Sequence, residues 1–203
     1  MRGTIVMTAI GGLFLTAATA FAADFSDPTW PCIQRKVDRL SVGLMWPDPP
    51  AAAPDMSDDT AAAVNDLVAR LSLRRIPVED LPPRVEAFTE AHGTDRALLG
   101  HVFAEVFDRL ARTRSEVVAG IEDYSLEQIA LSERIDAARG EMDSHMAGDE
   151  PDFDRVDALE EQIDWDQRIY TDRQRSLTYV CETPVLLEKR LYSIAQMLEG
   201  AAE

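Results

Sequence analysis

The residues best placed to do chemistry are the acids of one segment, from Glu141 to Asp166. This segment contains eleven acidic residues and one basic residue, Arg155, together with His145. Its middle holds four acids within six residues: Asp149, Glu150, Asp152 and Asp154. Clustered carboxylates can hold Ca²⁺, and His beside Met suits copper, but the spacing lacks the Gly and terminal Glu of an EF-hand loop. Three interpretations stay open: a solvated turn, a docking site for a basic partner, and a metal site.

Other residue types that commonly support catalysis form no recognisable motif. The three histidines, His92, His101 and His145, are widely separated in the chain. No Ser, Cys or Thr lies in a nucleophile motif, and neither H-E-x-x-H nor a phosphate-binding glycine loop occurs. The sequence therefore assigns no catalytic residue, no metal ligand and no cofactor.

The two cysteines, Cys32 and Cys181, predict one disulfide if the chain is exported. The bridge would close a loop of nearly 150 residues, worth about 5 kcal/mol in the chain-entropy account. A redox or metal-binding thiol pair is the alternative, although the expected C-x-x-C spacing is absent. We expect the bridge to hold the N-terminal segment on the C-terminal part of the chain.

The N-terminus has the pattern of a cleavable signal peptide over residues 1–22. Arg2 precedes a mostly apolar run from Ile5 to Ala18, and Ala20-Phe21-Ala22 forms an A-x-A cleavage site. A short membrane anchor is the alternative, but the run is shorter than the ~20 residues a spanning helix needs. We therefore expect export to the periplasm and no transmembrane segment in the mature chain.

The chain is strongly acidic, with 20 Lys and Arg against 37 Asp and Glu. Removal of residues 1–22 takes away one Arg and no acid, so the net charge becomes −18. Such a charge disfavours nucleic acid and anionic membrane surfaces as partners, because both are polyanions.

These residues must be positioned by two long heptad tracts that flank the acidic turn. Apolar residues recur at alternating steps of three and four on both sides of Met146–Pro151, which predicts helices over Thr94–Ser144 and Pro151–Glu199. Gly148 and Pro151 do not continue a helix, and a short connection makes the two helices antiparallel neighbours about 75 Å long. Pro184 falls on a core position of the second helix, where we expect a kink or a break.

Three polar residues occupy expected seam positions of this hairpin: Gln128, Asp166 and Arg173. Counting outward from the turn places Arg114 near Glu182 and Gln128 near Arg168. Polar residues in such a seam either fix the register of the helices or offer contacts to a third helix or another subunit. Both interpretations stay open, and we treat the three residues, with the four acids of the turn, as candidate partner-binding residues.

The remaining chain divides into two parts before the hairpin of residues 94–203, whose tip lies near 145–151. Residues 23–56 form an extended, Pro-rich segment with one short helix over Cys32–Leu44, anchored by Trp30 and Trp46. Residues 57–93 form short helices at the base of the hairpin, the first capped by Ser57 and the second ended by Gly93.

The segment Trp30–Val37, with the sequence Trp-Pro-Cys-Ile-Gln-Arg-Lys-Val, resembles the opening of small exported α-helical proteins of Gram-negative bacteria that are uncharacterised. The resemblance covers a small part of the chain. It implies a Gram-negative periplasmic location, and it carries no activity and no role for Trp30 or Cys32.

The sequence thus predicts an all-α protein: a long antiparallel, coiled-coil-like hairpin, a base of short helices and a disulfide-tethered N-terminal segment. Such a hairpin presents much surface and little concavity, which favours docking over substrate enclosure. The expected function is a non-catalytic periplasmic interaction protein, an accessory or adaptor subunit of an envelope complex, whose partner has a basic surface or is a second copy. The alternative is a periplasmic holdase-type chaperone; an enzyme or metal-binding protein is the less favoured class.

Overall fold

The computed structural model describes residues 27–50, 52–148 and 150–202, and 76% of these residues are helical, with no strand among them. The elements in chain order are a 3₁₀ turn (Val42–Leu44), α1 (Asp58–Ser72), a 3₁₀ turn (Val78–Asp80), α2 (Pro82–His92), α3 (Arg96–Met146) and α4 (Phe153–Ala201). The predicted all-α class is confirmed. The signal-peptide prediction lies outside the described residues.

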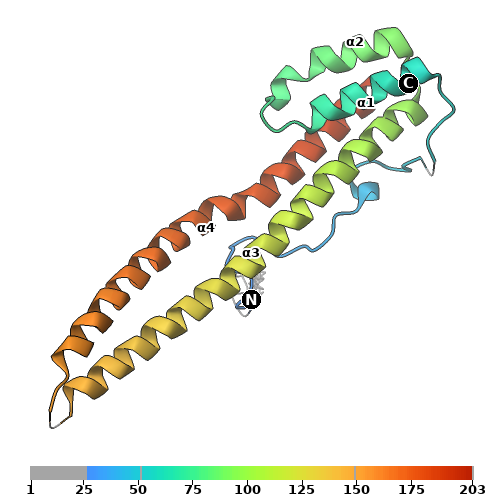
Figure 1. Cartoon of the computed structure of the whole chain (residues 1–203). Coiled ribbons are helices and arrows are strands. Elements are labelled where there is room, and N and C mark those ends of the chain that lie inside the picture. The colour runs from blue at the N-terminus through green and yellow to red at the C-terminus, as the bar shows by residue number, and fades with distance from the viewer. Residues whose placement is uncertain (1–26, 51, 149, 203) are drawn as a thin grey trace, which may run out of the picture.

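The two long helices, α3 and α4, pack along each other as an antiparallel hairpin whose far end projects away from the rest of the chain (Figure 1). Asp95 begins α3 by accepting a hydrogen bond from the Leu98 amide at 3.0 Å. Asp152 begins α4 in the same way through the Arg155 amide at 3.0 Å. Short polar side chains at these positions satisfy amides that have no partner within the helix.

The facing register differs by about one helical turn from the register counted on the sequence. Arg134 meets Asp166 and Glu127 meets Arg173, so facing residue numbers add to 300, whereas the predicted Gln128–Arg168 pair adds to 296. The cause is the position of the turn, because α3 continues to Met146 and α4 begins only at Phe153. The predicted Arg114–Glu182 proximity is therefore wrong, and Arg114 meets Glu188 instead.

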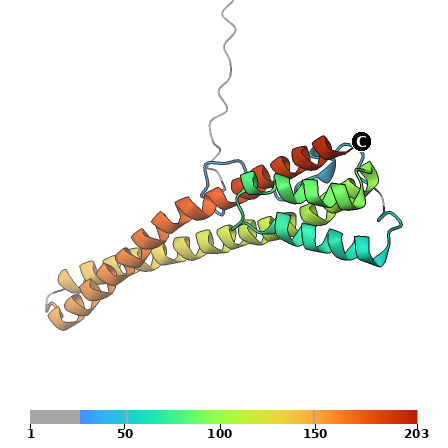
Figure 2. The ribbon, with the colours of Figure 1, turned by 90° about the horizontal axis from the view of Figure 1, so that it is seen from above.

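The base is formed by α1 and α2, which pack against one end of the hairpin (Figure 2). Helix α1 begins as predicted, with Ser57 Oγ accepting from the Thr60 amide at 3.2 Å. It buries one stripe against the hairpin: Val64, Leu67, Val68 and Leu71. At its end, the buried Arg190 of α4 donates to the main-chain oxygens of Leu71 and Ile76 at 2.7 to 2.9 Å. Arg190 thereby satisfies the Leu71 carbonyl, which the C-terminus of α1 leaves without a partner in the helix, and the Ile76 carbonyl of the loop that follows.

The apolar core is divided into three clusters along the hairpin. The base cluster is the largest and combines all four α-helices with Trp46. The second cluster surrounds Trp30 and the Cys32–Cys181 bridge, and the third lies towards the tip around Leu131, Ile135 and Leu159. Beyond the base the hairpin is two helices thick, so a large share of each helix faces solvent (Figure 2).

Residues 27–50, called the strap here, lie along the hairpin from its middle to its base (Figure 1). Trp30 is 7% exposed in the second cluster and Trp46 is 1% exposed in the base cluster, as predicted for two anchors. The predicted short helix over Cys32–Leu44 is wrong, because the strap is non-helical apart from the turn at Val42–Leu44.

The geometry of the strap explains the absence of that helix. Only Leu40 of its predicted apolar face packs against the base cluster, since Ile33 is 74% and Leu44 is 87% exposed. Trp30 and Trp46 sit in separate clusters, and extended chain spans about 3.3 Å per residue against 1.5 Å for a helix. Anchoring at both ends therefore favours the extended form.

Helix α4 runs continuously through the buried Pro184, so of the predicted kink or break the break is absent. No helix in the described part of the chain is both long and apolar enough to cross a membrane.

Candidate interaction site on the hairpin

The hairpin seam contains a charged pair at Asp166, one of the three predicted polar positions. Asp166 is 4% exposed in its side chain and accepts two hydrogen bonds from Arg134 of α3, at 2.8 and 2.5 Å. The carboxylate raises the pKa of Arg134 chiefly through these hydrogen bonds. Sequence reasoning missed Arg134, although its position opposite Asp166 follows once the register is known.

The other two predicted seam residues also make contacts across the hairpin. Gln128 is 7% exposed, and its Nε2 donates to the main-chain oxygen of Tyr170 at 3.1 Å. Arg173 forms an ion pair with Glu127 at 3.2 Å and places its guanidinium 5.5 Å from the centre of the Tyr124 ring. All three side chains therefore join α3 to α4, which fits the register interpretation; their role in partner binding stays a prediction.

A further polar pair, of which only the Arg114 side chain is buried, lies between the base cluster and the second cluster. Arg114 is 3% exposed, and its Nε donates to Glu188 Oε1 at 2.6 Å. Polar pairs at Arg114 and near Gln128 thus separate the three apolar clusters. Because a polar side chain placed against a facing apolar cluster would lose its partner, the alternation opposes sliding of one helix along the other.

At the tip, the predicted acids fall into different environments. Asp152 accepts the hydrogen bond that begins α4, while Glu150 and Asp154 are exposed, and Asp149 lies outside the described residues. The one basic residue of this segment, Arg155, is held by Glu141 through contacts of 2.9 and 2.6 Å. The exposed acids therefore present a negative surface at the end of the hairpin.

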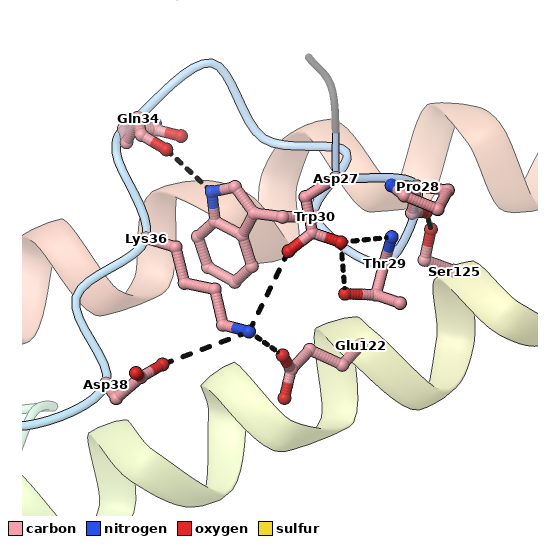
Figure 3. A network of polar contacts seen from close by, with 9 residues as sticks. All are labelled: Asp27, Pro28, Thr29, Trp30, Gln34, Lys36, Asp38, Glu122 and Ser125. Carbon is pink, nitrogen blue, oxygen red and sulfur yellow. Dashed lines mark hydrogen bonds and ion pairs between the residues drawn. The ribbon is translucent and has the colours of Figure 1, made fainter. Parts of the chain in front are cut away.

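The Cys32–Cys181 disulfide forms as predicted and joins the strap to α4, with a Cα–Cα distance of 5.5 Å. Beside it the indole Nε1 of Trp30 donates to the main-chain oxygen of Gln34 at 2.6 Å (Figure 3). Ser125 of α3 donates to the main-chain oxygen of Pro28 at 2.8 Å. These contacts fix the start of the strap on both long helices.

An ion cluster around Lys36 provides a second attachment of the strap (Figure 3). Lys36 pairs with Glu122 of α3 and lies near Asp27 and Asp38, at 4.0 and 3.9 Å. The hydrogen bond to Glu122 is the main cause that raises the pKa of Lys36. Two hydrogen bonds from Thr29, at 2.9 and 2.6 Å, lower the pKa of Asp27. One basic residue of the strap, Lys36, thus binds acids of the same chain.

A stripe of large apolar side chains lies exposed on α4, and sequence reasoning did not single it out. Trp165, Tyr179 and Leu186 are 64%, 74% and 51% exposed and follow one another at 14 and 7 residues. In a heptad-paired helix such spacing puts side chains on one face. We call these three residues the α4 outer stripe. Their heptad spacing is the same as that of the apolar residues in the seam, so the spacing does not distinguish them from core residues. Their exposed fractions in the structure do.

No group of three or more His, Cys, Asp or Glu side chains in the described residues is arranged to hold a metal ion. His92 lies against Phe88 at the end of α2, and His145 lies 3.7 Å from Glu141 near the tip. His92, His101 and His145 therefore lie in different parts of the fold and do not form a joint site.

A scan against protein-family models, a search of curated proteins and a search of solved structures each found no match for this chain.

Proposed function

We propose that the protein is a non-catalytic interaction protein of the periplasm, an accessory or adaptor subunit that docks on a partner through the projecting hairpin. The observation that carries the proposal is the α4 outer stripe. Trp165 and Tyr179 expose large aromatic surfaces on a helix whose other face is already buried in the seam. Trp and Tyr are enriched at the energetic centres of protein interfaces, because they bury a large area at low entropic cost.

The charge of the hairpin supports a partner with a basic surface. The exposed acids Glu150 and Asp154 lie at the tip, and further acids flank the stripe at Glu161 and Asp164. Complementary charge mainly accelerates encounter, whereas desolvated apolar contacts prolong the complex. The tip and the stripe would therefore contribute at different stages of one docking event.

Periplasmic location is part of the proposal and is supported by the N-terminal sequence pattern and by the disulfide, which persists in oxidising compartments. Fractionation of cells that produce the native chain tests this point directly. A protein found in the cytosolic fraction with residues 1–22 still attached would contradict it.

Site-specific photo-crosslinking tests the docking. A benzoylphenylalanine placed at Trp165 or Tyr179 is expected to give one discrete crosslinked product in cells. The same group at Ala137, an exposed position of α3, is the matched control and should give none. Equal crosslinking at all three positions, or none at the stripe, would contradict docking through this face.

A holdase-type chaperone is the second candidate, because exposed aromatic side chains also bind unfolded chains. It predicts a continuous smear of crosslinked clients in place of one product. It also predicts that the purified protein suppresses aggregation of a denatured test protein. Replacing Trp165, Tyr179 and Leu186 together by Ser should then abolish the suppression.

A further inference from the structure

Helix α4 carries a second heptad row on the face that exposes the α4 outer stripe. Asp172 continues the seven-residue spacing between Trp165 and Tyr179. The residues at the intervening steps of four are uncharged: Ile169, Ser176 and Thr183. Alternating steps of four and three from Trp165 to Leu186 are typical of a helix that packs along a second helix. We call this row, from Trp165 to Leu186, the outer seam.

One flank of the outer seam carries five exposed charges at seven-residue spacing. In chain order they are Glu161, Arg168, Arg175, Glu182 and Lys189. Arg175 is paired with Asp172 at 3.5 Å, whereas the other four form no ion pair with any described residue. These four side chains are therefore available to charges on another molecule.

The order of these charges is complementary to itself when it is reversed. In an antiparallel pair of helices related by a two-fold axis, each flank faces the same flank of the other copy, and facing residue numbers add to a constant. With a sum of 350, Glu161 faces Lys189 of the second copy, and Arg168 faces Glu182 of the second copy. Each pair occurs twice by symmetry, and Arg175 lies at the axis.

Sliding one helix by a heptad removes this complementarity. A sum of 343 places Glu161 against Glu182 and Arg168 against Arg175, so both contacts join like charges. A sum of 357 places Arg168 against Lys189 and leaves one complementary contact, between Arg175 and Glu182. Like charges across an interface disfavour these two registers and so select the first.

We propose that the outer seam binds a second copy of this chain as an antiparallel, two-fold symmetric dimer. The inference rests on the proposed docking through the α4 outer stripe and names its occupant. Trp165 of each copy packs on Leu186 of the other, and the Tyr179 hydroxyl donates to the Asp172 carboxylate of the other. The three stripe side chains expose roughly 400 Å² of apolar surface per copy, close to the apolar share of the ~800 Å² that each partner buries in a standard interface.

The charge of the hairpin tip also favours the antiparallel arrangement. A parallel dimer would place the acidic segments from Glu141 to Asp166 of the two copies side by side. In the antiparallel register the two Glu150 residues lie roughly 75 Å apart at 1.5 Å of rise per residue, far beyond the Debye length of about 8 Å. Both tips stay free for a basic partner.

Sedimentation equilibrium of the purified, disulfide-bonded chain tests the dimer. We expect a monomer–dimer equilibrium, and Trp165→Ser should raise its dissociation constant about tenfold or more, because it removes an aromatic contact from both halves of the interface. Circular dichroism checks that this variant, altered at an exposed position, keeps its helices. A chain that stays monomeric up to about 1 mM, or a dimer unaffected by Trp165→Ser, would overturn the proposal.

Charge reversal tests the register. Glu161→Lys and Lys189→Glu should each weaken the dimer about fivefold to tenfold, because each places like charges at two symmetric contacts. The double variant Glu161→Lys/Lys189→Glu restores both contacts and the net charge, so its dissociation constant should return to within about twofold of the native value. Glu133→Lys, the same charge change at an exposed position of α3, is the matched control and should not weaken the dimer. A double variant that does not recover affinity contradicts the proposal.

Distances between nitroxide labels test the orientation. A label attached through Arg175→Cys should lie within about 25 Å of its copy, whereas a label attached through Gln196→Cys should lie about 60 Å from its copy. A parallel dimer would bring both pairs of labels within about 25 Å and would overturn the proposal.

Photo-crosslinking at Trp165 separates this inference from the proposed function. A product with twice the mass of the chain is the result expected here. A product with a different protein, from a chain that is monomeric when purified, sinks the dimer and leaves the proposed docking intact. A chain that dimerises when purified but gives no product at the stripe in cells contradicts the proposed function alone.

Discussion

Arg134 on α3 donates two hydrogen bonds, of 2.8 and 2.5 Å, to the carboxylate of Asp166 on α4, yet the two side chains are buried to different extents. Asp166 is 4% exposed, whereas Arg134 is 56% exposed. Removal of either partner thus has a different consequence. Without Asp166 the guanidinium turns to water, but without Arg134 a carboxylate stays inside the seam with no countercharge.

Arg134→Ala should therefore destabilise the protein more than Asp166→Ala. An uncompensated buried charge is the costly outcome, so we expect the loss in unfolding free energy for Arg134→Ala to be about twice that for Asp166→Ala. Urea denaturation of the two single variants and the double variant measures both values and their coupling. Equal losses in the single variants would show that Asp166 is not held at its observed burial.

Loss of the Cys32–Cys181 bridge should release the strap and spare the hairpin. The bridge spans 149 residues, so the chain-entropy account predicts a loss of up to about 5 kcal/mol for the Cys32→Ser/Cys181→Ser variant. Limited trypsin digestion should then cut first at Arg35, Lys36 or Arg39 in the strap. Unchanged stability and an unchanged first cleavage site would contradict a tethering role.

Replacement by alanine should change the stability of the protein in opposite directions at two glycines of α3. A Cβ at Gly120 meets nothing within 4 Å, so Gly120→Ala should stabilise by up to about 1 kcal/mol through helix propensity. At Gly100 a Cβ would lie 3.0 Å from Pro50 Cδ and 3.2 Å from Trp46 Nε1. Gly100→Ala should therefore destabilise by about 1–3 kcal/mol, as overpacking does. Thermal unfolding compares the two, and equal shifts would mean that the strap does not press on α3 there.

Neutralising the tip should slow association and leave the fold intact. In the variant Asp149→Asn/Glu150→Gln/Asp152→Asn/Asp154→Asn the cap of α4 is kept, since Asn begins helices as well as Asp does. With the partner recovered by crosslinking, the association rate at low salt should fall and lose its salt dependence, whereas the dissociation rate should hardly change. An unaltered association rate would show that the tip is only solvated.

Attachment of the strap should depend on pH at both extremes. Asp27 has a pKa lowered below 3.8, so its contribution is present above that value and is lost as the pH falls through the lowered pKa. Lys36, which faces Asp27, Asp38 and Glu122, has a pKa raised above 10.5, so its contribution is lost as the pH rises through that raised value.

Amide hydrogen exchange at Thr29, whose amide donates to Asp27, reports on this attachment. After correction for intrinsic exchange, protection should be constant from about pH 5 to 9 and fall beyond both ends. Asp27→Asn should reduce protection within this range of constant protection, and it should remove most of the further loss of protection at acid pH. A plateau unaffected by this substitution would mean that the Asp27 carboxylate does not hold the strap.

The sequence alone determined the class and outline of the fold. Heptad spacing with one Gly and Pro break is sufficient for two long antiparallel helices, because the apolar faces have no other partner of matching length. Capping by Ser57, the glycine end of α2 and the burial of Trp30 and Trp46 follow from equally local rules. The chain contains only two cysteines, so a disulfide within the chain could join only Cys32 to Cys181.

Tertiary structure decided the register, the path of the strap and which polar residues meet. A change of two residues at each end of the turn moves every facing pair by one helical turn. The heptad pattern of each helix is the same before and after such a shift, so the pattern does not determine the register. The strap is extended because both of its tryptophans are bound far apart, a long-range constraint that overrides the helical pattern of Cys32–Leu44. The same constraint leaves a cavity of about 380 Å³ beside the disulfide, between the strap, α3 and α4. Exposure of Trp165 and Tyr179 also depends on which helix face the seam buries, and residue type alone does not report that choice.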